Sequence, residues 1–170
     1  MSDTATIVPS LANAHQWQIV PQGFFSRHYQ LVWNGQTVAT LRMSLWKESC
    51  EFTIAGHTFT ISRTSMWKDG FLLATEGQTV CEVKRTFWSR QFALVASEQT
   101  WTLKPAGFFT RIYQLLADDR EVGTIRPAGW FTRKQFADFA PDVPPPIQVL
   151  AIYLFLVIHQ REQRNASSGS

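Results

Sequence analysis

The chain repeats itself with a period of 42 residues, and this repeat limits its fold more than any other feature of the sequence. Three consecutive units, residues 17–58, 59–100 and 101–142, align without an insertion. Such a repeat indicates one small structural unit built three times in succession. Six aromatic or aliphatic columns recur in phase: Trp17, Phe59 and Trp101; Tyr29, Phe71 and Tyr113; Leu31, Leu73 and Leu115; Val38, Val80 and Val122; Trp46, Trp88 and Trp130; Phe52, Leu94 and Phe136.

Within each unit, apolar residues alternate with polar ones, which is typical of strands rather than helices. In the first unit the alternation predicts four strands, at roughly 17–20, 28–33, 37–42 and 50–54. Three units of four strands make twelve. A sheet of that size tends to curl, and closing it into a barrel removes its edges.

Two-residue turns punctuate the predicted strands at equivalent places. Asn34-Gly35, Glu76-Gly77 and Asp118-Asp119 separate the second strand from the third in each unit, and Ala55-Gly56 joins the first unit to the second. Asn-Gly is the strongest short hairpin signal, because both turn residues need positive φ. The adjacent carboxylates Asp118 and Asp119 are therefore expected to form a turn rather than a catalytic pair.

The segment after the third unit predicts what fills the barrel. Residues 147–158 contain one strongly polar side chain, Gln148, and follow three prolines, which suit the first turn of a helix. A helix of this length spans about 18 Å, against the roughly 30 Å of a bilayer core, so we expect no transmembrane span. A barrel of about twelve strands is too wide for side chains from its strands alone to fill. The small residues Ala39, Cys81 and Gly123, if they face inward, leave room for a helix.

The predicted fold is thus mainly β. It is a closed antiparallel barrel of about twelve strands, in three four-stranded repeats, around a buried hydrophobic C-terminal helix at about residues 146–160. We expect one domain over residues 15–162, a flexible N-terminus over 1–14 and a disordered tail over 163–170, whose composition is rich in Ser and Gly.

This arrangement resembles the tubby-like superfamily, and within it the LURP-one-related and phospholipid scramblase-like proteins. The resemblance covers residue 17 to about residue 160 and rests on the repeat together with the segment PPPIQVLAIYLFLVIHQ. It implies a membrane-associated or phosphoinositide-binding module rather than a catalyst. The chain lacks the acidic calcium-binding segment and the cysteine cluster of scramblases, so lipid scrambling is not expected.

Because each unit has an even number of strands, equivalent loops share one end of the barrel. The loops between first and second strands and between third and fourth strands define an upper rim, where basic and aromatic residues gather. A helix that returns through the barrel also carries Arg161 and Arg164 there. The lower rim collects acids, including Glu76, Glu98 and Asp142. The candidate lipid or ligand residues on the upper rim are Arg42, Lys84, Arg126, Arg27, Lys68, Arg111, Trp46, Trp88 and Trp130.

Each column of this rim has two interpretations. Aromatic residues at a barrel mouth commonly fold inward and plug it, so we expect this role more often than membrane insertion for Trp46, Trp88 and Trp130. For Arg42, Lys84 and Arg126 (the third-strand column), a solvated role and ligand contact stay equally open.

Catalysis is not expected. The four histidines have no metal-ligand spacing, and His159 is expected at the C-terminal end of the helix. No phosphate-binding loop or nucleophile motif is present, and no cofactor is implied. With two cysteines and no signal-peptide pattern, a cytoplasmic location is expected. Nucleic acid is not an expected partner, because the basic columns do not follow one strand face.

Two functions follow. The first is a non-enzymatic binding module whose basic, aromatic rim recognises anionic phospholipid headgroups, attached peripherally to the membrane. The net charge of +3 then conceals a dipolar molecule whose basic end faces the lipid. The alternative is a protein-interaction or structural barrel without lipid binding, its rim aromatics packed inside.

Overall fold

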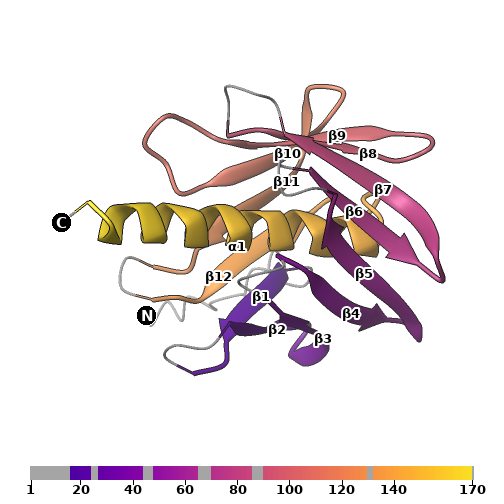
Figure 1. The fold of residues 1–170 in the computed structure, drawn as a ribbon, viewed down its shortest axis with the longest axis horizontal. Helices are drawn as coiled ribbons and strands as arrows, with labels where there is room; N and C mark the ends of the chain where they lie inside the picture. Colours follow the sequence, from indigo (N-terminus) through magenta and orange to yellow (C-terminus); the bar gives the residue numbers. More distant parts are fainter. Residues whose placement is uncertain are drawn as a thin grey trace, which may run out of the picture.

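The computed structural model describes residues 16–23, 27–43, 48–64, 70–85, 90–129 and 132–169. Twelve antiparallel strands form a nearly closed barrel, and the C-terminal helix α1 (Pro145–Ser167) runs through it (Figure 1). The predicted fold class is confirmed. The strands are β1 (Gln16–Pro21), β2 (His28–Trp33), β3 (Gln36–Arg42), β4 (Cys50–Ile54), β5 (His57–Arg63), β6 (Gly70–Thr75), β7 (Gln78–Arg85), β8 (Phe92–Val95), β9 (Thr100–Pro105), β10 (Tyr113–Ala117), β11 (Arg120–Pro127) and β12 (Gln135–Phe139).

The sheet is continuous from β4 through β5 and the following strands to β12, and then through β1 and β2 to β3. Pairing of β1 with β12 brings the first and last strands together. The two end strands of the sheet, β3 and β4, come within 8 Å of each other between Cα atoms, but no ladder joins them. The barrel therefore has one seam, which lies inside the first repeat.

The predicted hairpin turns are confirmed by their backbone angles. Asn34-Gly35 has φ of 49° and 76°, Glu76-Gly77 has 49° and 77°, and Asp118-Asp119 has 48° and 62°. Positive φ at both positions is the signature of a tight type I′ hairpin. Asp118 and Asp119 thus form a turn.

Each of the three units carries a β-bulge at the same position. In each unit the pairing between the second and third strands shifts by one residue, after Leu31, Leu73 and Leu115. The residue left without a Cα partner belongs to one sequence column, Val38, Val80 and Val122. A bulge bends and twists its strand, so three equivalent bulges distribute the curvature that wraps the sheet around the helix.

The small residues that follow the bulges face inward, as expected: Ala39 and Cys81 are buried, and so is Gly123. At Gly123, however, the space is taken by the sheet rather than by the helix. A Cβ built there would lie 2.3 Å from Cδ1 of Phe139 on the neighbouring strand β12.

The last strand departs from the repeat. In the second unit Val83 pairs with Leu94, whereas in the third Ile125 pairs with Ala137, one residue later than the repeat predicts. A shift of one residue turns every side chain to the opposite face. Phe136 therefore lies on the outer side, unlike its repeat counterparts, while Ala137 and Phe139 face the core.

Helix α1 is the core of the barrel, as the sequence predicts. Every residue from 147 to 158 is buried, and removal of each large aliphatic or aromatic side chain from water stabilises the fold by about 1.5–3 kcal/mol before entropy losses. The helix begins at Pro145 and continues to Ser167, so it extends beyond the expected end near residue 160 and into the segment from residue 163 that we expected to be a disordered tail. The expected N-terminal segment 1–14 lies outside the described residues.

Candidate functional site

The two ends of the barrel are identified by contacts of α1. Near its start, Gln148 bonds to Trp17 at the beginning of β1, which places this end at the lower rim. Near its end, Gln160 Nε2 lies 3.7 Å from Sδ of Met43, just after β3. The helix therefore carries its basic C-terminal half to the upper rim, as expected.

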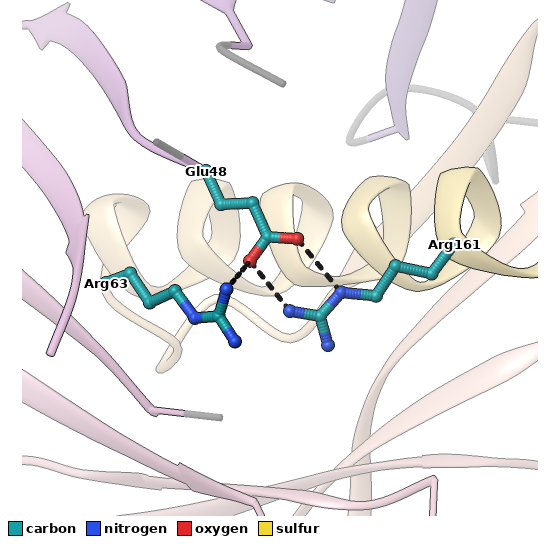
Figure 2. A network of polar contacts seen from close by, with 3 residues as sticks. All are labelled: Glu48, Arg63 and Arg161. Carbon is teal, nitrogen blue, oxygen red and sulfur yellow. Dashed lines mark hydrogen bonds and ion pairs between the residues drawn. The ribbon is translucent and has the colours of Figure 1, made fainter. Parts of the chain in front are cut away.

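A polar network joins the helix to the barrel at this rim (Figure 2). Arg161 donates from Nε to Glu48 Oε1 at 3.0 Å and from Nη2 to Oε2 at 2.7 Å. Arg63, at the end of β5, places Nη1 3.3 Å from the same Oε2. The Glu48 side chain is 11% exposed and the two arginine side chains 28% or less. Two guanidinium groups share one carboxylate, so the network keeps one excess positive charge.

Glu48 holds this position at a conformational cost. It has a φ of 41°, in the left-handed region that residues other than glycine rarely adopt. It also stands in the connection between β3 and β4, the two strands of the seam. The network thus fastens the seam of the barrel to β5 and to α1.

Further cations surround the C-terminal half of the helix. Burial of the imidazole lowers the pKa of His159, and the neighbouring Arg111 and Arg133, in two different loops, lower it further. Arg90 pairs with Glu162 at 3.1 Å. The expectation that His159 ends the helix is wrong: α1 continues past it, and its ring stacks on Phe155 with centroids 5.9 Å apart.

The loop between β9 and β10 carries the most exposed apolar side chains in the described part of the chain. Phe108 is 96% exposed and Phe109 104%, next to the exposed Arg111. Hydrogen bonds from Ala106 N to Ile112 O, at 2.8 Å, and from Ile112 N to Thr110 Oγ1, at 3.0 Å, close the base of the loop. At this loop the aromatic residues point away from the barrel and do not plug it.

The third-strand column is not one binding site. Arg42, Lys84 and Arg126 are exposed at equivalent positions of β3, β7 and β11. These strands are separated by intervening strands around the barrel, so the three side chains lie at one height but on different sides. Arg27 and Arg111 lie exposed in two upper-rim loops. Lys68, Trp46, Trp88 and Trp130 lie outside the described residues.

Two members of this column have partners on the outer wall. Lys84 lies 3.5 Å from Glu82, and Arg126 lies 4.0 Å from Asp138 with its guanidinium 5.4 Å from the Phe136 ring centroid. These are exposed pairs, which contribute little to stability. Contact of each residue with a ligand stays a prediction.

The lower rim carries mostly acids and tight turns. Arg120 pairs there with Asp142 at 3.1 Å, and Glu76 lies 3.8 Å from His57. The described loops therefore differ in charge between the two ends, as the sequence predicts.

The described residues present neither a reactive thiol nor a cluster of metal ligands. Burial raises the pKa of both Cys50 and Cys81 to about 12, so neither thiol is a thiolate at neutral pH. Nowhere in the described ranges do three His, Cys, Asp or Glu residues gather as a metal site requires. No described helix has the length and apolarity to cross a bilayer.

Sequence reasoning missed the pairing of Glu48 with Arg63 and Arg161. A signal was present: Glu48 shares its repeat column with Arg90 and Thr132, and Arg63 shares its column with Pro21 and Pro105. Both residues break the repeat. Comparison of the chain with family models, with curated proteins and with solved structures finds no match in any of the three.

Proposed function

We propose that this barrel is a non-enzymatic module that attaches peripherally to anionic phospholipid surfaces through its upper rim, on the cytosolic side of the membrane. The observation that carries the proposal is the exposure of Phe108 and Phe109 beside Arg111. Soluble proteins commonly expose single apolar residues, but two adjacent and fully exposed phenylalanines among cations are typical of an interaction surface.

The energetics suit reversible attachment. Moving a phenylalanine side chain from water into an apolar layer contributes about 1.5–3 kcal/mol. A basic residue near an anionic leaflet contributes about 1 kcal/mol. Two phenylalanines, with Arg111 beside them and Arg133 and Arg164 on the same rim, would supply roughly 6–9 kcal/mol before the costs of association. Once those costs are subtracted, the net free energy supports weak, reversible binding rather than permanent attachment.

The resemblance to tubby-like and LURP-one-related proteins supports the same proposal, because it implies a phosphoinositide-binding or membrane-associated module. The dipolar charge distribution supports an orientation with the upper rim toward the lipid. Acids at the lower rim would face away from the membrane.

Vesicle co-sedimentation tests the proposal. We expect binding to vesicles that contain phosphatidylserine or phosphoinositides, little binding to phosphatidylcholine alone, and a loss of binding as salt rises. Phe108→Ser with Phe109→Ser should weaken binding at least tenfold, since it removes about 3–6 kcal/mol of gross apolar transfer.

A charge-matched pair of variants provides the control. Arg111→Glu at the upper rim should reduce binding, whereas Arg120→Glu at the lower rim, with the same change in net charge, should not. Equal and negligible binding to neutral and anionic vesicles at low salt would rule the proposal out. Loss of a specific protein partner in the phenylalanine variant, without vesicle binding, would favour a protein-interaction barrel.

A further inference from the structure

Four charged side chains among the described residues stand at one structural position of the upper rim, two residues before a strand that leaves it. They are Glu48 before β4, Arg90 before β8, Arg111 before β10 and Arg133 before β12. By the repeat alone Thr132 corresponds to Arg90, but the one-residue shift of β12 brings Arg133 to this position. We can therefore compare what each of the four side chains meets.

The β11–β12 loop repeats the closure described above for the β9–β10 loop. Ala128 N donates to Lys134 O at 2.9 Å, and Lys134 N donates to Thr132 Oγ1 at 3.1 Å. Arg111 and Arg133 each stand between the threonine and the residue whose carbonyl closes the loop. Two loops of the same build thus present their arginines from equivalent places.

Two of the four positions pair with the C-terminal half of α1 by opposite charge. Glu48 accepts both hydrogen bonds from Arg161, and Arg90 lies 3.1 Å from Glu162. An acid of the rim meets a base of the helix, and a base of the rim meets an acid. Charge matching therefore joins the helix to the mouth of the barrel at these two loops.

The other two positions face an imidazole instead of a carboxylate. His159 lies one turn before Glu162, on the same face of α1, and its ring stacks on Phe155. Its charged neighbours are Arg111 and Arg133 from the two loops and Glu162 from its own helix. Burial and then the two guanidinium groups lower the pKa of His159. A proton on the ring would add a third positive charge to the two arginines.

An anionic lipid surface changes this balance. Headgroup phosphates that approach Arg111 and Arg133 oppose the field of the two guanidinium groups at the ring. A surface potential of about −30 to −50 mV also raises the local proton concentration about three- to sevenfold. The ring of His159 is already half-buried in the free protein, so loss of its remaining water on docking is the smaller, opposing effect. Attachment through Phe108 and Phe109, in the same loop as Arg111, therefore favours the protonated ring.

We propose that His159 makes attachment of the upper rim to anionic lipid sensitive to pH: the bound protein takes up a proton on the imidazole, so acidification strengthens attachment. This inference rests on the proposed function and assigns its regulation. The coupling is reciprocal, because a surface that favours the proton is bound more tightly by the protonated protein. The gain begins as pH falls through the pKa of the ring in the bound state and is complete below its pKa in the free state.

Vesicle co-sedimentation at several pH values tests the coupling. The probe is a vesicle of phosphatidylcholine with phosphatidylserine. Between pH 7.5 and 5.5 affinity should rise about threefold more in the wild type than in His159→Gln. Both proteins meet the same vesicles, so any effect of pH on the lipid cancels. His57→Gln, at the lower rim, should keep the wild-type rise, and a circular dichroism spectrum at each pH verifies that the barrel is intact.

Two further measurements follow the proton itself. Calorimetry at about pH 6.5, in two buffers of different ionisation enthalpy, should show that binding takes up a fraction of one proton in the wild type and less in His159→Gln. Without lipid, Arg111→Gln should raise the pKa of the His159 ring, followed by its Cε1–Hε1 NMR signal. Arg120→Gln, with the same change in charge at the lower rim, should not.

The failures of the coupling and of the proposed function can be told apart. Binding to anionic vesicles with the same pH dependence in the wild type and His159→Gln would overturn the coupling and leave lipid attachment standing. So would attachment that weakens in acid in the wild type alone, or an unchanged titration of His159 in Arg111→Gln. Absence of binding to anionic vesicles at every pH, with that titration shifted as expected, would overturn the proposed function and the coupling with it.

Discussion

The indole N–H of Trp17 donates a 2.6 Å hydrogen bond to Oε1 of Gln148 and thereby joins the first strand of the barrel to the first turns of the helix inside it. Gln148 Nε2 donates in turn to the carbonyl oxygen of Val143 at 2.7 Å. Both the oxygen and the nitrogen of this side-chain amide, the one strongly polar side chain in the buried part of the helix, therefore have hydrogen-bond partners. Because apolar packing has no direction, these bonds fix how far the helix enters the barrel.

Replacement of this glutamine should therefore destabilise the fold although it makes the helix more apolar. Gln148→Met keeps the side-chain length but leaves the Trp17 N–H and the Val143 carbonyl without their partner. We expect the free energy of unfolding to fall by about 1–3 kcal/mol in urea denaturation. Gln78→Met, at an exposed position of β7, should change it by less than about 0.5 kcal/mol. Equal stability of the two variants would contradict this role.

The network at the upper rim predicts an asymmetry between acid and base. Glu48→Gln leaves two mostly buried guanidinium groups without a counter-charge, whereas Arg63→Gln leaves Glu48 still paired with Arg161. We expect the free energy of unfolding to fall by about 1–2 kcal/mol in Glu48→Gln and by less in Arg63→Gln. The expected fall is smaller than for a fully buried ion pair, because both arginines are partly exposed.

Chemical denaturation of these variants would measure this difference. Glu162→Gln provides the control, because it removes an equal charge from a more exposed pair with Arg90, whose side chain is 56% exposed. A larger effect of Arg63→Gln than of Glu48→Gln would show that the carboxylate is not the centre of the network.

Gly123→Ala should be costly because the new methyl group would meet the Phe139 ring. We expect the free energy of unfolding, measured by heat or urea, to fall by about 1–3 kcal/mol. Adding Phe139→Leu to this variant should restore part of that stability, because the smaller side chain makes room for the methyl group. Gly107→Ala, where the nearest atom is 3.7 Å away, should be tolerated. Additive effects of Gly123→Ala and Phe139→Leu would contradict the clash.

Stability should fall on mild acidification, in part through His159. Its folded-state pKa is lowered, so the neutral ring is favoured in the barrel. This contribution is present above the unfolded pKa of about 6.5 and is lost as pH falls below it. The fall in the free energy of unfolding between pH 7.5 and 5.5 should therefore be smaller in His159→Gln than in the wild type.

The same pH series on a lower-rim histidine isolates this effect. His57→Gln, at a side chain that is 65% exposed, serves as the matched control for removal of a histidine. A wild-type pH slope in His159→Gln would contradict a role for the buried imidazole, whose charged neighbours are Arg111, Arg133 and Glu162.

Features that the repeat determines could be predicted from the sequence. The hairpin at Asn34-Gly35 needs positive φ at both residues, which residue type alone indicates. The core helix follows from an apolar segment too short to cross a bilayer. The side of the barrel on which Ala39 and Cys81 lie follows from strand alternation.

Features that break the repeat could not be predicted in the same way. The shift that turns Phe136 outward depends on how Phe139 packs over Gly123, a contact between strands that no local pattern reveals. The Glu48 network depends on where the helix ends, and the helix continues beyond its apolar segment because polar residues 161–167 still favour helix at the surface. The missing ladder between β3 and β4 depends on closure of the whole sheet.

The position of α1 after β12 also affects how the protein is made. Ribosomes add about 5–20 residues per second, so the strands emerge on the order of ten seconds before the helix that covers their inner faces. During that interval the nascent sheet exposes a row of aromatic and aliphatic side chains to solvent. Folding must then wait for the last segment to be translated, and holding chaperones should engage this protein while its chain is still growing.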